Sequence, residues 1–198
     1  MLFPGMLVPG SNHFPLMQFA REHYFQYYWL IEYDVIFTGN WQDFFLYFDQ
    51  AKEDFLTSRI RRYSEQRDWP WWSSLRHPYK KIQVSKMIRS FNPIYRISYA
   101  ALKYIDKMHK EKWIGHHEVL YPTMLYLAGF KLRDFGGLGE FVMSEDKSRF
   151  YLETSSSESY DGTMRSKNPH SQISDVPRNK LVHPVKPVRK ANNLQRSR

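Results

Sequence analysis

The triplet Glu32-Tyr33-Asp34 is the first stretch of this sequence whose residue types and spacing could do chemistry. It follows a short aromatic and apolar run typical of a buried strand, where side chains two residues apart project to the same face of the sheet. Two carboxylates aimed at one point repel each other unless a positive charge lies between them. A hard divalent cation such as Mg²⁺ or Mn²⁺, itself bound to phosphate, would supply that charge. Because acid-x-acid triplets are common, solvated turn acids or acids paired with arginine remain the alternative.

A second stretch, His116-His117-Glu118, lies near the start of a predicted helix. A carboxylate beside two imidazoles could act as a general base whose pKa is tuned by its neighbours, so Glu118 and His117 are candidate catalytic residues. The spacing differs from that of a helical zinc site, which needs a four-residue step between its ligands. The alternative is a set of surface polar residues that cap the helix.

A third stretch, Asn179 to Lys186, falls in a late loop. His183 could serve as a metal ligand there, and Lys186 could contact a phosphate oxygen. Together with the two acids they would complete a metal and diphosphate site. A single loop histidine more often has no such role, which is the alternative here.

The elements that must position these residues alternate between helix and strand. Strands are predicted at 27–33, 54–60, 87–91 and 130–132, and helices after Asn12, after Asn40, after Ser98 and within 117–128. Asn40 and Ser98 are typical helix N-caps. Asn92-Pro93 is expected to end the third strand, and Gly129 the last helix. Such alternation favours a layered α/β domain.

The composition supports one domain with a sizeable core. The chain has 198 residues, of which 42% are hydrophobic and 17% aromatic, too many for a chain disordered throughout. It contains no cysteine, which excludes a disulfide framework, a thiolate zinc site and a cysteine nucleophile. No stretch approaches the roughly 18 uncharged apolar residues of a membrane-spanning helix. The first residues lack the pattern of a secretory signal.

The positive charge is concentrated at the C-terminus. Seven lysines and arginines follow Asp175 with no acid among them, which leaves +2 of the net charge of +9 for residues 1–175. We therefore divide the chain into a core (1–142), a mobile loop or flap rich in serine (143–178) and a basic disordered tail (179–198). The tail begins with the candidate metal and diphosphate segment. It could contact anionic lipid, RNA or nothing specific.

The order of the candidate stretches resembles a known family. The resembling segments are residues 9–15, 28–35 with 38–41, 91–98, 117–123 and 183–186. Together they are similar to nucleotide-sugar glycosyltransferases of the GT-A type, and in particular to uncharacterised bacterial glycosyltransferase-like families. Each motif is loose, but the ordered set spans most of residues 9–186. The resemblance implies an α/β fold with a GT-A-like mixed sheet flanked by helices.

The resemblance also implies roles for the candidate residues. Asp34 would bind the metal directly, Glu32 would support the metal or the donor ribose, and His183 would be a third metal ligand. Glu32 stands where the family usually has the shorter Asp. Glu118 matches the acid that deprotonates the acceptor hydroxyl in inverting members. Arg165 lies in the flap, which could close over the donor and exclude water.

The same family implies the cofactor and the substrates. The metal would be Mn²⁺ or Mg²⁺, and it would neutralise the diphosphate that leaves as the glycosidic bond breaks. The donor would be a nucleotide-diphosphate sugar with Lys186 on its phosphate, and the acceptor a glycan or glycolipid of surface polysaccharide synthesis. The residues assigned to the acceptor are Asn40, Trp41, Trp71 and Trp72. Aromatic rings can stack on apolar sugar faces, although core packing accounts for most of these aromatic residues equally well.

A further expectation concerns the beginning of the chain. The family reaches its metal-binding strand only after a nucleotide-binding half of several strands and helices, whereas here one predicted helix precedes residue 27. The resemblance therefore predicts an N-terminally incomplete domain, which is inactive alone unless an upstream segment or a partner supplies the rest. The expected location is the cytoplasm, with peripheral contact to the inner face of an anionic membrane.

Two other functions compete with a glycosyltransferase. A non-catalytic binding or scaffold module would use the basic tail on anionic lipid or nucleic acid, with affinity that falls steeply with salt. The body lacks an interleaved basic and aromatic sheet pattern, which argues against nucleic acid. A hydrolase would use Glu32 and Asp34 as acid and base. Glycosidase carboxylates flank the bond from opposite sides, about 5–10 Å apart, whereas this pair is expected on one side.

Overall fold

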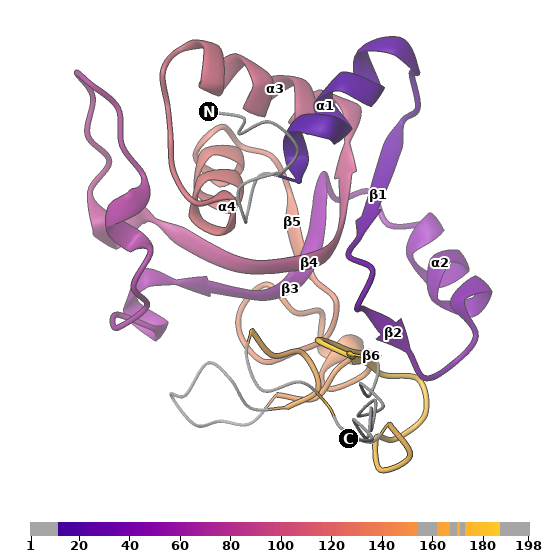
Figure 1. Ribbon diagram of the computed structural model, residues 1–198. Coiled ribbons are helices and arrows are strands. Elements are labelled where there is room, and N and C mark those ends of the chain that lie inside the picture. Colours follow the sequence, from indigo (N-terminus) through magenta and orange to yellow (C-terminus); the bar gives the residue numbers. More distant parts are fainter. Residues whose placement is uncertain (1–11, 154–161, 167–169, 171–172, 187–198) are drawn as a thin grey trace, which may run out of the picture.

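A four-stranded mixed sheet forms the centre of the computed structural model, which describes residues 12–153, 162–166, 170 and 173–186 (Figure 1). The strands are β1 (Tyr27–Ile31), β3 (Phe55–Arg62), β4 (Ile88–Ser98) and β5 (Leu132–Asp134), in the spatial order β1-β4-β3-β5. β4 is antiparallel to both β1 and β3, and β5 is parallel to β3. The predicted α/β fold with a mixed sheet flanked by helices is therefore confirmed.

Helices cover both faces of this sheet. Helices α1 (His13–Glu22), α3 (Tyr99–Lys110) and α4 (His117–Leu127) lie on one face, and α2 (Trp41–Asp49) packs on the other side (Figure 1). Successive strand residues alternate between the two layers: Phe55 faces the first and Leu56 the second. This follows from the two-residue period of a strand, which sends neighbouring side chains to opposite faces.

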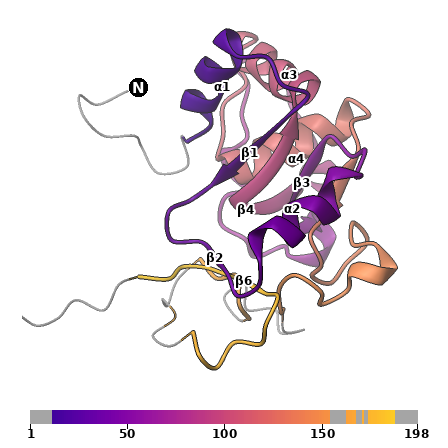
Figure 2. The same ribbon diagram turned by 90° about the vertical axis from the view of Figure 1, so that its right-hand side faces the viewer.

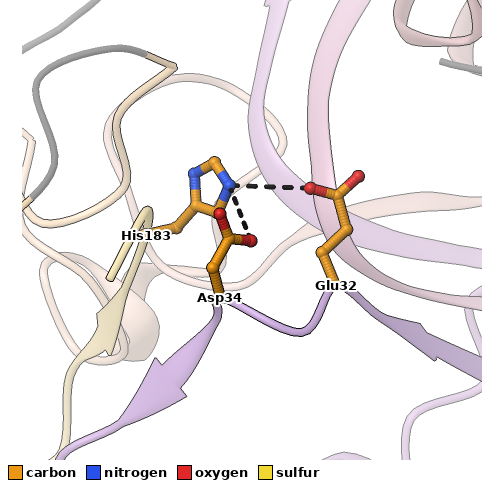
Figure 3. Close-up of side chains that lie close together, drawn as sticks. All are labelled: Glu32, Asp34 and His183. Atoms are coloured by element: carbon orange, nitrogen blue, oxygen red, sulfur yellow. Dashed lines mark ion pairs between the residues drawn. The ribbon is translucent and has the colours of Figure 1, made fainter. Parts of the chain in front are cut away.

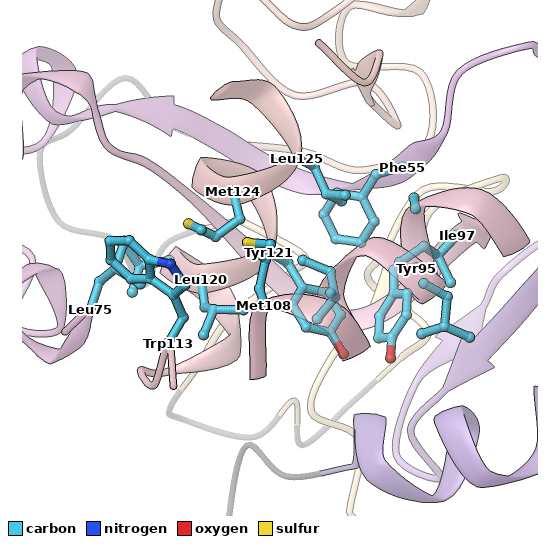
Figure 4. Close-up of a cluster of buried hydrophobic side chains, with 14 of the residues drawn as sticks. Phe55, Leu75, Tyr95, Ile97, Met108, Trp113, Leu120, Tyr121, Met124 and Leu125 are labelled. Atoms are coloured by element: carbon cyan, nitrogen blue, oxygen red, sulfur yellow. The ribbon is translucent and has the colours of Figure 1, made fainter. Parts of the chain in front are cut away.

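The first core lies between the sheet and helices α1, α3 and α4 (Figure 4). Phe55, Tyr95 and Tyr121 are fully buried at its centre, with ring centroids 5.7–6.1 Å apart. The α3 residues Leu102, Ile105 and Met108, which recur at helical spacing, are buried in it. This core fixes the position of α4, which carries Glu118.

The second core lies beneath the opposite face of the sheet. Phe44 and Phe48 of α2 are completely buried there against Phe135 and Phe150. Parts of the predicted flap, which includes a 3₁₀ turn at Ser144–Asp146, thus pack against the body through Phe150 and Met164. Residues 154–161, 167–169 and 171–172 of that segment lie outside the described residues, and its closure over a ligand stays a prediction.

A small second sheet brings the C-terminal segment back to the body. Strand β2 (Ile36–Phe37) pairs antiparallel with β6 (Leu181–Val182), and Figure 2 shows these two strands below the main sheet. Residues 179–186, which were expected to begin the disordered tail, are therefore part of the folded body. The remaining tail residues, 187–198, lie outside the described residues.

A long aromatic loop joins β3 to β4. It contains three short 3₁₀ turns, Tyr63–Glu65, Trp72–Ser74 and Val84–Lys86. Trp69 and Trp72 are buried in the first core, whereas Trp71 is 50% exposed. In the described part of the chain, none of the helices combines the length and the apolar character needed to cross a bilayer.

The predicted helix boundaries are largely confirmed. The Asn40 side chain accepts the backbone N–H of Gln42 at 2.9 Å, and Ser98 caps α3 in the same way through Ala101. Helix α4 ends as predicted before Gly129, whose φ of 84° is the left-handed conformation that glycine favours. Because Phe130 still bonds back to the helix, the following strand β5 begins at Leu132, two residues later than expected.

The prediction that Asn92-Pro93 ends a strand is wrong. Strand β4 continues to Ser98 because its pairing with β3 is irregular at this point, with register shifts on either side of Ser58. Pro93 has no N–H to contribute to a ladder, and a bulge is the place in a sheet where none is needed. The N–H of Asn92 is thereby freed for a partner outside the sheet.

We expect Asn40→Ala to lower the free energy of unfolding by about 1 kcal/mol, because the orphan N–H of Gln42 loses its acceptor. Asn40→Asp keeps an acceptor oxygen and should stay near wild type. Urea unfolding followed by circular dichroism measures both. Equal losses in the two variants would show that Asn40 acts through something other than the cap.

Candidate functional site

Glu32, Asp34 and His183 converge although they come from opposite ends of the chain (Figure 3). His183 Nε2 lies 3.6 Å from Glu32 Oε2 and 3.5 Å from Asp34 Oδ1. One ligand atom from each residue lies within 4.8 Å of the other two. The structure thus brings together the three residues that the sequence singled out as metal ligands, which we call the triad.

The two acids are positioned by a turn rather than by strand pleating. Strand β1 ends at Ile31, and the N–H of Val35 donates to the carbonyl of Glu32 at 3.1 Å. The N–H of Glu32 donates to the carbonyl of Pro93 at 2.8 Å, which holds the start of this turn against β4. The expectation that both carboxylates share one face of a strand is therefore wrong in detail, although both reach the same point.

Backbone hydrogen bonds fix His183 from both sides. Its N–H donates to the carbonyl of Thr163, and its own carbonyl accepts the N–H of Arg165, each at 2.9 Å. The N–H of Val185 donates to the carbonyl of Asp34 at 2.9 Å, immediately after the β2–β6 pairing. The C-terminal segment is thus fastened beside the acids by main-chain bonds that do not depend on the triad's side chains.

The imidazole of His183 is oriented for coordination through Nε2. Its Nδ1 lies 2.6 Å from the backbone carbonyl of Arg165, an acceptor that requires the proton to be on Nδ1. Nε2 then presents a lone pair toward the two acids. The ring also makes an edge contact with Phe91 at 5.3 Å.

The donor set fits a divalent cation. Two carboxylates and a neutral imidazole place three acceptor atoms together, and a cation relieves the repulsion between them. Carboxylate oxygens are ligands that Mg²⁺ and Mn²⁺ prefer, and an imidazole ligand is typical of divalent transition metals. Asn12 donates its Nδ2 to the other oxygen of Glu32 at 3.1 Å and orients that carboxylate. The sequence predicts Asn12 only as the residue before a helix; its side chain makes no cap hydrogen bond to α1 and instead serves Glu32.

Glu118 is a nearly buried acid at the start of α4, with 12% of its side chain exposed. Its Oε1 accepts the N–H of Asn92 at 3.3 Å. Burial raises the pKa of Glu118 to about 7, while the positive charge of Arg89 opposes that rise; the charge of Glu32 raises the pKa further and His183 lowers it. Glu118 is therefore electrostatically coupled to the triad.

His116 and Arg89 flank this carboxyl group. His116 Nδ1 accepts the N–H of Glu118 at 3.3 Å and lies 3.7 Å from Glu118 Oε2. Arg89 is buried with its guanidinium over the ring of Trp69 at 4.8 Å. Burial lowers the pKa of Arg89 to about 10, so it stays charged near neutral pH and compensates an ionised Glu118.

The bulge at Asn92 and Pro93 connects the triad to Glu118. The N–H of Asn92 bonds Glu118, and the carbonyl of Pro93 bonds the N–H of Glu32. One irregular stretch of β4 therefore sets the position of both acidic groups. The sequence predicts a strand end at these two residues, so this link was not expected. The signal for a bulge was the proline inside the resembling stretch 91–98.

The side chain of Asn92 is itself unusual. Its Oδ1 accepts hydrogen bonds from the hydroxyls of Thr57 and Ser90, at 3.0 and 2.7 Å. Its Nδ2 is buried and finds no acceptor among the described residues. An unpaired buried donor costs free energy. An acceptor atom of a ligand bound beside the acids would pair with this Nδ2 and remove that cost.

His117 packs away from Glu118 in the first core. Its ring stacks on His13 at a centroid distance of 6.2 Å, and His13 in turn stacks on His109 at 5.3 Å. Burial lowers the pKa of His117 well below its ordinary range. The predicted catalytic role of His117 stays a prediction, and its observed contacts are those of a core residue.

The four predicted acceptor residues are not gathered in one place. Asn40 caps α2, and Trp41 packs on the rings of Phe37 and Phe45. Trp72 is buried and donates its indole N–H to the carbonyl of Gln66. Trp71 instead stacks on His116 at 5.1 Å, beside Glu118.

The predicted donor-binding residues lie next to His183. Arg165 bonds His183 through its backbone, while its side-chain Nε donates to the carbonyl of Gly162 at 2.6 Å. Lys186 is exposed three residues beyond His183. Contact of either side chain with a donor stays a prediction.

We expect Mn²⁺ to stabilise the wild-type chain against heat. At about 100 times its Kd, a ligand stabilises the fold by about 2.7 kcal/mol, which for a domain of this size is a rise of about 5–10 °C in Tm. Asp34→Asn and His183→Ala should lose this rise, whereas Asp68→Asn, which alters an exposed carboxylate elsewhere, should keep it. Differential scanning fluorimetry with and without EDTA measures the effect, and an undiminished rise in both triad variants would remove the metal assignment.

We expect Glu118→Gln to stabilise the metal-free fold more at high pH than at low pH. Because the pKa of Glu118 is raised from 4.5 to about 7 on folding, stability is lost as the pH rises through 7. The gain should be about 3 kcal/mol at pH 8 and less than about 1 kcal/mol at pH 5. Chemical unfolding at both pH values measures it, with Glu22→Gln at an exposed carboxylate as the control. A gain independent of pH contradicts the raised pKa.

The evidence for function therefore comes from the residues themselves. The triad, the coupled acid Glu118 and the unpaired amide of Asn92 form one continuous arrangement around the β4 bulge. Comparison with protein-family models, with curated proteins and with solved structures finds no match to this chain.

Proposed function

We propose that this chain is a metal-dependent glycosyltransferase, or part of one, that moves a sugar from a nucleotide-diphosphate donor to a glycan or glycolipid acceptor. The observation that carries the proposal is the convergence of the triad with a buried acid coupled to it, Glu118. Two acids and one imidazole can hold a divalent cation, and a separate acid of suitable pKa can remove a proton. Sugar transfer from a diphosphate donor needs both of these functions.

Glu32, Asp34 and His183 would hold the cation in this proposal. A bound divalent cation would offset the negative charge that develops on the leaving diphosphate. The chain prepares this site in advance, because Asn12 orients Glu32 and the carbonyl of Arg165 fixes the tautomer of His183. Such support keeps the ligands in place before the donor arrives.

Glu118 is the proposed general base. It takes the proton from the acceptor hydroxyl while the acceptor oxygen bonds the anomeric carbon and the bond from that carbon to the diphosphate breaks. The products are the glycosylated acceptor and the free nucleotide diphosphate. A pKa of about 7 suits this role because the group can both lose and accept a proton near neutral pH.

Asn92 is the proposed link between the metal site and the general base Glu118. Its backbone N–H bonds Glu118, and its buried Nδ2, which has no acceptor among the described residues, would donate to a substrate oxygen. An amide held by Thr57 and Ser90 cannot rotate freely, so its donor direction is fixed before substrate binds. This arrangement also explains why a strand would keep a costly bulge at this position.

A glycosidase is disfavoured by the same geometry. Glu32 and Asp34 both lie about 3.5 Å from His183 Nε2, on one side of it, rather than on two sides of a bond to be cleaved. The competing scaffold function depends mainly on tail residues 187–198, which lie outside the described residues, and it stays a prediction.

The test is release of nucleotide diphosphate from a panel of nucleotide-diphosphate sugars with Mn²⁺ and glycan acceptors. For a donor that is turned over, we expect Glu118→Gln to lower kcat by about 10²–10⁴-fold, the range of general-base catalysis. Asp34→Asn should lose activity, and Glu22→Gln should retain it. Because the base must be ionised, the wild-type rate should rise with pH and level off above about 7.

A wild-type rate that Glu118→Gln leaves unchanged would exclude Glu118 as the base. Turnover that persists in Asp34→Asn with EDTA present would exclude the metal-dependent mechanism. If the chain binds Mn²⁺ through the triad but releases nucleotide diphosphate from none of the donors, the metal site stands. Sugar transfer by this chain alone is then overturned.

A further inference from the structure

A shallow surface pocket of about 260 Å³ lies beside Glu118, on the side where Trp71 is exposed. The residues that line it are Trp71, Ser74, Arg76, Ile114, Gly115 and His116. It is separate from the triad and is formed by the aromatic loop after β3 and by the segment that precedes α4. Two of its side chains, Trp71 and Ile114, are 50% and 59% exposed, so the pocket offers apolar surface to solvent.

The walls of this pocket are held rigidly by the backbone. Arg76 and Ile114 exchange two backbone hydrogen bonds of 2.8 and 3.0 Å. The N–H of His116 donates to Ser74 Oγ at 3.0 Å. A Cβ on Gly115 would lie 3.0 Å from the Cα of Leu75, so glycine permits the close approach of the two segments. The pocket is therefore formed before any ligand binds.

The indole of Trp71 is a fixed aromatic platform in this pocket. It stacks on the imidazole of His116 with a centroid distance of 5.1 Å and an interplanar angle of 15°. Burial lowers the pKa of His116 to about 4, so the supporting ring is neutral at physiological pH. An exposed aromatic ring that is already ordered loses little conformational entropy when a flat apolar ligand packs on it.

His116 also ties the platform to Glu118. Its Nδ1 accepts the N–H of Glu118 and lies 3.7 Å from Oε2 of that residue, whose side chain is 12% exposed. The same imidazole thus supports the aromatic ring and touches the proposed base. A ligand on Trp71 would lie next to Glu118, the group that removes the acceptor proton in the proposed function.

We propose that this pocket binds a pyranose ring of the acceptor, with the apolar face of the sugar on Trp71. This inference rests on the proposed function and specifies the acceptor: a pyranose ring lies at its reacting end. The volume is below the roughly 300–1,000 Å³ of sites for larger organic ligands, which suits one ring rather than a long chain. Arg76, held by a bond from its Nε to the carbonyl of Ser73, places guanidinium donors at the edge for sugar hydroxyls.

The experiment is saturation-transfer NMR of the metal-free, full-length chain with methyl β-glucoside, methyl β-galactoside, methyl α-mannoside and methyl β-glucuronide. At least one glycoside should receive saturation at its ring C–H protons in the wild type. Trp71→Ala should reduce that signal at least tenfold, and Trp71→Phe should keep part of it. Tyr79→Ala is the matched control, because Tyr79 is an aromatic side chain that is 85% exposed outside the pocket.

Equal signals in wild type and Trp71→Ala, with both folded by circular dichroism, would overturn the proposal. The absence of transfer to all four glycosides in the wild type would do the same. Asp34→Asn should bind the glycoside as the wild type does, and Trp71→Ala should still bind Mn²⁺. The sugar platform and the metal-dependent function can therefore fail separately.

Discussion

The convergence of Glu32, Asp34 and His183 is the interaction on which the candidate site depends. The His183 imidazole lies within 3.6 Å of both, with its proton directed away to a backbone carbonyl. Two acids held this close need a counter-charge, and the chain supplies the third ligand from its far end. The β2–β6 pairing and the bond from Val185 to Asp34 hold that far end in place.

The bulge in β4 is the second element on which the site depends. A regular central strand would use every backbone group in ladders, whereas here Asn92 directs its N–H to Glu118, and the carbonyl of Pro93 continues the β1–β4 register to Glu32. The same few residues hold a buried unpaired amide and contact an acid of raised pKa. Several features that each lower the stability of the fold lie in one place here. Such clustering is typical of functional sites, where the rest of the fold supplies the compensating stability.

Helix α4 joins the chemistry to the hydrophobic core. Its body is anchored by Tyr121 in the first core, and its N-terminus places Glu118 against β4 and His116 against Trp71. Arg89 balances the charge of the buried acid, which limits the rise of its pKa. The burial of this helix in the body therefore raises the pKa of Glu118.

The sequence by itself determined the local features: the Asn40 and Ser98 caps, the end of α4 at Gly129, the α/β alternation and the chemical types of the triad and of Glu118. These depend on contacts between near neighbours, which residue type and spacing encode directly. Only the tertiary structure decided that His183 meets the acids, that Asn12 and Asn92 serve the site, and that His117 packs in the core. Those outcomes depend on pairing between segments far apart in the chain and on an irregular strand register, which contacts between near neighbours do not fix.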